Sequence, residues 1–144
     1  MNARNFFSDD EKKRIVDAIV KAEAETSGEI RVHISEHCKE GALNAAAFWF
    51  EKLEMHKTER RNGALFFLAV KDREFAVIGD AGINSRVPAD FWDGVRRTMS
   101  ARFQENLFAE GLTEGIAMAG EALKQYFPLE GENKNELPDE ISYG

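Results

Sequence analysis

A single carboxylate flanked by glycines is the pattern with the clearest chemical use in this sequence. Asp80 follows an apolar run at 75–78 and lies between Gly79 and Gly82. In α/β proteins, ligands bind beyond the carboxyl ends of strands, and glycines let the backbone turn its carbonyl groups toward such a site. Asp80 is therefore our first candidate for a binding residue. Calcium, which takes about six to eight oxygen ligands, is the candidate ion.

Two further aspartates lie where a helix is expected to begin. Asp90 and Asp93 are three residues apart and share one helix face, and the preceding loop can fold their carboxylates toward Asp80. The candidate metal ligands are Asp80, Asp90, Asp93, the backbone carbonyls of Gly79 and Gly82, and Glu110 as a further oxygen donor. The alternative is structural: Asp80 closes a turn, and acids in a first helical turn are stabilised by the helix dipole.

Side chains of the types that bind zinc are also present, namely His33, His37, Cys38 and His56. Their spacing does not predict a compact site, because His33 falls on the polar face of a strand and His56 follows a helix. We expect isolated surface histidines and a half-buried thiol.

The sequence lacks the familiar phosphatase motifs. Cys38 is followed six residues later by Asn44 where a cysteine phosphatase has arginine, and no paired-aspartate motif follows Asp80. One enzymatic arrangement stays open: a metal-bound water near Asp80, with Arg60 or Arg61 holding a phosphate group.

The elements that must position these residues follow from periodicity. A capping box from Ser8 to Glu11 predicts a helix that Gly28 closes, and strict alternation at 29–35 predicts a strand with one buried face. A helical pattern at 43–55 precedes an apolar run at 64–70. Strand, helix and strand in this order predict a right-handed crossover with parallel strands.

The second half of the sequence predicts a mixed sheet covered by helices. The strands at 64–70 and 74–79 are so close that they form a hairpin, and the run at 64–70 lacks polar alternation, as in strands buried on both faces. Amphipathic helices follow Pro88 and Leu112. We predict a three-layer α/β/α sandwich around a small mixed β-sheet, with one domain at 1–127 and an acidic, proline-containing tail at 128–144.

Composition narrows the range of partners. The net charge of −7 argues against nucleic-acid binding, which needs a basic surface. The only cysteine, Cys38, fits a reducing compartment, and the sequence has neither a signal-peptide pattern nor an apolar run long enough to span a membrane. We expect a cytoplasmic monomer.

Several short segments together resemble the TPM domain family. They are the sequence TERRNG at 58–63, the segment from Ile78 to Ile83, Asp90, the sequence FAEGL at 108–112, Phe127-Pro128, and the segment from Asn135 to Ile141. The resemblance implies an α/β/α sandwich and divalent-cation binding, most often of calcium. The family includes a thylakoid-lumen protein reported as an acid phosphatase.

We therefore predict a non-enzymatic calcium-binding module that mediates interaction with a protein partner. The alternative function is a metal-assisted acid phosphatase acting on phosphomonoesters at the same loop. The segment from Leu137 to Ile141 is either a docking peptide for a partner or a tail that packs on its own domain.

Overall fold

A computed structural model of the chain describes residues 2–129 and 138–144. Its helices and strands are, in chain order, α1 (Asp9–Glu23), β1 (Glu29–Ser35), α2 (Ala42–Lys52), β2 (Gly63–Ala69), β3 (Glu74–Gly79), α3 (Ala81–Asn84), α4 (Phe91–Gln104), α5 (Phe108–Tyr126) and β4 (Ser142–Tyr143). Two short 3-10 helices lie at Ala3–Asn5 and Met55–Lys57. Asn135, Glu136 and Leu137, which carry part of the family resemblance, lie outside the described residues.

The sheet has four strands in the order β3-β2-β1-β4. β1 and β2 are parallel, with Glu29 opposite Gly63, and β2 and β3 form the predicted antiparallel hairpin. β4 runs parallel to β1 and places Ser142 opposite His33. The sheet is therefore mixed, as predicted.

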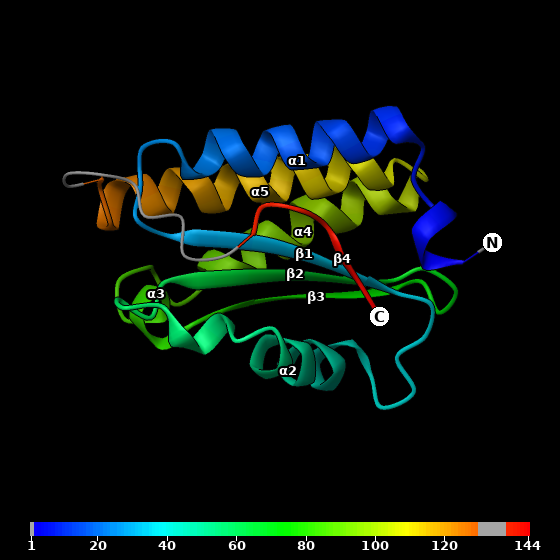
Figure 1. The fold of residues 1–144 in the computed structure, drawn as a ribbon, viewed down its shortest axis with the longest axis horizontal. Coiled ribbons are helices and arrows are strands. Elements are labelled where there is room, and N and C mark those ends of the chain that lie inside the picture. Colours follow the sequence, from blue (N-terminus) through cyan, green and yellow to red (C-terminus); the bar gives the residue numbers. More distant parts are fainter. Residues whose placement is uncertain (1, 130–137) are drawn as a thin grey trace.

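Helices cover both faces of this sheet, which confirms the α/β/α sandwich (Figure 1). α1, α4 and α5 pack over one face, with α5 in contact with both of the others, and α2 packs on the opposite face against β2 and β3. Within the described residues, no helix is both long and apolar enough to cross a bilayer.

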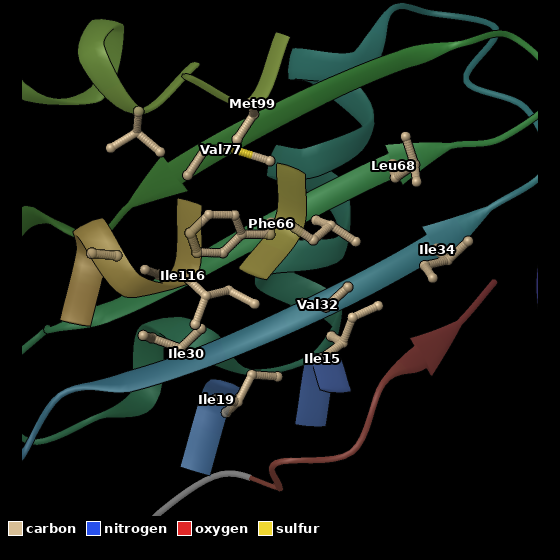
Figure 2. Packing of buried hydrophobic residues seen from close by; sticks show 14 of the residues in the cluster. Ile15, Ile19, Ile30, Val32, Ile34, Phe66, Leu68, Val77, Met99 and Ile116 are labelled. Carbon is tan, nitrogen blue, oxygen red and sulfur yellow. The ribbon is translucent and has the colours of Figure 1, made fainter. Parts of the chain in front are cut away.

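The main core lies between the sheet and the three-helix layer. Figure 2 shows Ile30 and Val32 of β1 beside Ile19 and Ile15 of α1, and Ile34 further along the same strand belongs to the same cluster. Every residue of β2 is buried, as the absence of polar alternation predicts. The helices are held on the sheet by burial of this apolar surface, which contributes about 25 cal/mol per Å².

Two helix boundaries differ from the sequence prediction. The capping box of α1 is confirmed: Ser8 Oγ accepts from the Glu11 N–H at 3.1 Å, and Glu11 Oε1 accepts from the Ser8 N–H at 2.9 Å. α1, however, ends at Glu23, so Gly28 is not its capping glycine. Gly28 instead allows close packing, because a Cβ there would lie 2.6 Å from Leu123 Cδ2. α4 begins at Phe91, three residues after Pro88.

The described part of the C-terminal segment packs on its own domain. Besides the pairing of β4, the Gly144 N–H donates to the Ile34 carbonyl at 3.1 Å, and Ile141 and Tyr143 pack against the main core. Figure 1 shows this segment in red beside β1. Of the two alternatives for the tail, packing on its own domain is the one seen for residues 138–144.

Candidate functional site: two clusters of metal-ligand groups

Asp80 lies at the start of α3 and is bound by an arginine. Arg61 Nε donates to Asp80 Oδ2 at 2.7 Å, and Arg61 Nη2 donates to Asp80 Oδ1 at 2.8 Å. The Ala81 N–H also donates to Asp80 Oδ1, at 2.7 Å. The Asp80 side chain is 5% exposed, whereas that of Arg61 is 52% exposed. The charge of this buried carboxylate is thus balanced within the chain by a bidentate pair.

The glycines around Asp80 have structural contacts. The Gly79 carbonyl accepts from Asn84 Nδ2 at 2.8 Å, and the Gly82 carbonyl accepts from Ser85 Oγ at 2.9 Å. A Cβ on Gly82 would lie 2.2 Å from the Arg60 carbonyl oxygen, so only glycine fits there. Both carbonyls predicted to be metal ligands therefore already bond to side chains of the same loop.

The other predicted ligands have separate surroundings. Asp93, on the exposed face of α4, pairs with Arg96, and Asp90 makes no side-chain cap bond at the start of that helix. Glu110 Oε1, at the start of α5, accepts from Arg14 Nη1 at 3.2 Å. None of the four predicted acidic residues belongs to a group of converging side-chain ligand atoms in the described parts of the chain. A calcium site on these six residues stays a prediction.

Three carboxylates do converge elsewhere, and we call Glu23, Glu29 and Asp139 the carboxylate cluster. One oxygen from each lies within 4.8 Å of the others. Glu23 is the last residue of α1, Glu29 is the first residue of β1, and Asp139 precedes β4. Glu23 is 5% exposed and Glu29 is 2% exposed.

The connection between α1 and β1 fixes the cluster's geometry. Thr26 Oγ1 donates to the Phe127 carbonyl and accepts from the Gly28 N–H at 3.0 Å, so this connection is anchored to the end of α5. Glu23 Oε2 then accepts from the Ile30 N–H at 2.8 Å. The end of a helix and the start of the next strand are thereby held side by side, which brings both glutamates to one point.

The electrostatics of the cluster favour a proton or a cation. Burial raises the pKa of Glu23 to about 10, helped by its hydrogen bond with Asp139 and by the charge of Glu29, against the opposing effect of the Ile30 N–H. The cation-free cluster therefore favours keeping a proton among its carboxyl groups at neutral pH. A bound cation would replace this proton, because it stabilises all three carboxylates in their charged form.

A neighbouring polar residue adds another oxygen to this region. The Asn62 carbonyl accepts from the Glu29 N–H at 3.2 Å, and Asn62 Nδ2 donates to Ser27 Oγ at 3.2 Å. Asn62 is 1% exposed, and its Oδ1 has no hydrogen-bond partner among the described residues. Asn62 is therefore a buried oxygen donor beside Glu29.

A second cluster lies at the opposite end of the sheet. Cys38 Sγ and one carboxylate oxygen each from Asp72 and Glu74 lie within 4.8 Å of one another. Burial, with the charges of Glu74 and Asp72, raises the pKa of the Cys38 thiol to about 11. Asp72 Oδ1 is 2.7 Å from His37 Nδ1, so we call Cys38, Asp72, Glu74 and His37 the thiol cluster.

His33 is not at the surface, and that prediction is wrong. It is fully buried, its ring stacks on Trp49 with 4.0 Å between the centroids, and its Nδ1 is 2.7 Å from Ser142 Oγ. Burial lowers the pKa of His33 to about 4, with a smaller effect of the Arg31 charge. Of the predicted transition-metal set, the structure brings only His37 and Cys38 into one cluster.

The fold defines a class of protein, the three-layer α/β/α sandwiches, in which helices cover both faces of one sheet. The family model of the TPM domain, whose name also carries the word phosphatase, matches residues 1–122. The chain belongs to the TPM domain family.

Solved structures agree with this assignment. The NMR structure of the BA42 protein from the psychrophilic bacterium Bizionia argentinensis is 43% identical, with 97% of each chain covered and a TM-score of 0.90. The N-terminal domain of the cg2496 protein from Corynebacterium glutamicum is 13% identical, with 82% of this chain and 74% of that chain covered and a TM-score of 0.66.

The N-terminal domain of a protein from P. gingivalis is 17% identical, with 85% of this chain and 80% of that chain covered and a TM-score of 0.69. The last two similarities concern the fold alone. No curated protein matches the chain.

Proposed function

We propose that this protein is a divalent-cation-binding module that holds Ca²⁺ at the carboxylate cluster, Glu23, Glu29 and Asp139. The observation that carries the proposal is the convergence of three carboxylates within 4.8 Å, two of them buried. Like charges brought together away from water are costly unless a proton or a cation compensates them. A cation-binding function would give a role to carboxylates that come together from α1, β1 and the segment before β4.

The donor set fits a hard cation. Carboxylate oxygens are the ligands that Ca²⁺ prefers, and three of them supply up to about six oxygens when they bind in bidentate fashion. Water or the nearby Asn62 oxygen would complete the shell. Mg²⁺ takes the same ligand type but demands a stricter octahedral arrangement at shorter distances.

The predicted role in protein interaction fits the origin of the ligands. Asp139 belongs to the segment that continues into β4, whereas Glu23 and Glu29 belong to the main domain. A bound cation would therefore tie this segment to the domain and stabilise the surface that both present to a partner. The partner itself, the monomeric state and the cytoplasmic location stay predictions.

One contact at the predicted loop argues against the acid phosphatase alternative. Arg61, one of the two arginines offered for phosphate, donates two hydrogen bonds to Asp80. A phosphate group would have to compete with this buried carboxylate for the guanidinium. The name of the family model is the remaining support for phosphatase activity.

Calorimetric titration of the full chain with CaCl₂ tests the proposal. We expect binding to the wild-type protein and a loss of affinity of more than about 100-fold in Glu23→Gln and Asp139→Asn, because each removes one ligand charge. Glu25→Gln is the matched control, since Glu25 follows the same helix but pairs with Lys124 at 2.7 Å on the surface. Equal calcium affinity in Glu23→Gln, Asp139→Asn and Glu25→Gln would refute the proposed site.

A further inference from the structure

The thiol cluster lies where this fold offers a second place for a ligand. β1 and β2 are parallel, and the residues just beyond their carboxyl ends meet: Cys38 and His37 follow β1, and Asp72 follows β2. Open α/β sheets bind ligands at this edge. In Figure 1 the loop after β1 and the β2–β3 turn lie at the end of the sheet opposite to α3.

The side chains there are held in place by hydrogen bonds. Asp72 Oδ2 accepts from the Cys38 N–H at 2.7 Å, and Asp72 Oδ1 lies 2.7 Å from His37 Nδ1. These two contacts tie the loop after β1 to the hairpin turn. They fix the Asp72 carboxylate beside the Cys38 sulfur, and Glu74 at the start of β3 supplies a second carboxylate.

We propose that the thiol cluster is a site for a divalent transition metal, with Zn²⁺ as the expected ion. Cys38 Sγ, Asp72 and Glu74 are the protein ligands, and the fourth position is taken by His37 or by water. Zinc is bound by thiolate, imidazole and carboxylate at about 2.0–2.3 Å, which puts tetrahedral ligand atoms roughly 3.5 Å apart. Ligand atoms within 4.8 Å of one another reach this spacing by small side-chain rotations.

The binding step is a proton exchange. The metal–sulfur bond forms as the S–H bond of Cys38 breaks, and the proton passes to solvent; no electron is transferred. Burial of Cys38 leaves the sulfur shielded, whereas Glu74 and His37 are exposed and give the ion a path from solvent. His37 also lines an open cleft of about 540 Å³ together with Ser35 and Glu36.

Because it contains a thiolate, this site should select a different metal ion from the carboxylate cluster. Soft sulfur ligands select zinc and its neighbours, whereas an all-oxygen set suits calcium and magnesium. The two sites are far apart in the fold, at opposite ends of β1. The zinc proposal therefore does not depend on the calcium proposal.

Cobalt substitution tests the zinc site directly. Co²⁺ added to the reduced full chain should bind with one equivalent, and its near-ultraviolet sulfur-to-cobalt charge-transfer band reports a bond to thiolate. Zn²⁺ added afterwards should remove the band by displacement. The band should be absent in Cys38→Ser, and the affinities of Glu74→Gln and Asp72→Asn should fall by at least about 10–100-fold, the loss that even an outer-shell partner causes.

Matched controls separate this site from general surface binding. Glu36→Gln removes a nearby acid that pairs with Lys71 at 3.6 Å, and Glu23→Gln removes the other cluster, so both should keep the cobalt band. Glu74 is exposed, so Glu74→Gln tests the ligand without risk to folding. Two results would overturn the proposal: a cobalt complex without a charge-transfer band, or zinc affinity that Cys38→Ser and Glu74→Gln leave unchanged.

Discussion

Asp80 and Glu23 are both buried carboxylates beside a helix end, but their charges are compensated in opposite ways. Asp80 receives two hydrogen bonds from Arg61 and one from the Ala81 N–H. Glu23 instead meets two other carboxylates, and burial beside them raises its pKa. A buried acid paired with arginine is structurally satisfied, whereas a buried acid among acids leaves a place for a cation.

The topology of the sheet explains why Asp80, the carboxylate that stands out most in the sequence, is not at the edge where ligands usually bind. The rule that ligands bind at the carboxyl ends of strands applies to parallel strands. β3 is antiparallel to β2, so its carboxyl end, where Asp80 lies, is level with the amino ends of β1 and β2. Asp80 therefore sits at the opposite edge from the thiol cluster.

The largest expected effect is calcium stabilisation through the carboxylate cluster. At a free calcium concentration about 100 times the Kd, the wild-type protein should gain about 3 kcal/mol in free energy of unfolding. Glu23→Gln should lose nearly all of this gain, because it removes a ligand charge while keeping the shape of the protonated side chain. Thermal and urea unfolding with calcium and with EDTA measure both values. An equal gain in the variant would mean that Glu23 does not bind the ion.

The next effect is expected from substitutions of Asp80, which should lower the free energy of unfolding without changing calcium affinity. Asp80→Ala should cost about 1–2 kcal/mol, because it removes the acceptor at the start of α3 and the partner of Arg61. Asp80→Asn should cost less, since asparagine keeps a capping oxygen. Urea unfolding gives the costs, and calorimetry should find unchanged calcium affinity. A loss of calcium binding in Asp80→Asn would favour the site predicted from the sequence.

The third effect is a pH dependence that should distinguish the two carboxylates. Without calcium, folded Glu23 has a pKa of about 10 against 4.5 ordinarily, so above about pH 4.5 the folded state binds a proton that the unfolded state has lost. Stability should therefore fall as the pH rises from about 5 to 9, because folding takes up a proton that becomes scarcer.

The control for this pH effect is the isosteric variant. Glu23→Gln has no such proton to lose, so its free energy of unfolding in EDTA should fall less steeply with pH than that of the wild-type protein. Urea unfolding at a series of pH values measures both slopes. Parallel slopes would mean that Glu23 is already ionised in the folded protein.

The smallest effect is expected at Asp93, which the sequence also offered as a ligand. Its pair with Arg96 is exposed, so Asp93→Asn should change stability by no more than about 0.5 kcal/mol. Calcium affinity should stay at the wild-type value in the same calorimetric experiment. A tenfold weaker affinity would instead place Asp93 at the ion.

The fold class could be predicted from the sequence because local patterns encode most of its helices and strands, although not α3 or β4. The capping box at Ser8, the alternation at 29–35, the unbroken apolar run of β2 and the short hairpin break each act over a few residues. Parallel pairing of β1 and β2 followed from the crossover rule. The helix end at Glu23 was missed because bonds from Thr26 to the distant α5, rather than a glycine cap, fix the chain there.

The candidate sites were harder to predict because long-range contacts create them. Asp139 lies more than a hundred residues from Glu23, and no spacing rule connects them. One pattern could have pointed to buried polar groups: Glu29 and His33 alternate with core residues of β1 and therefore share its other face. We expected water on that face, but α2 and the C-terminal segment cover it, as the stacking of Trp49 on His33 shows.

A calcium titration followed by amide NMR is the sharpest test of the carboxylate cluster as a calcium site, because it locates the ion along the chain. We expect the saturable shifts to concentrate at Glu23, at Glu29 and Ile30, and around Asp139, and Glu23→Gln should abolish them. Shifts concentrated instead at Gly79–Ile83, with residues 23–30 unmoved, would contradict this expectation and place the cation at Asp80.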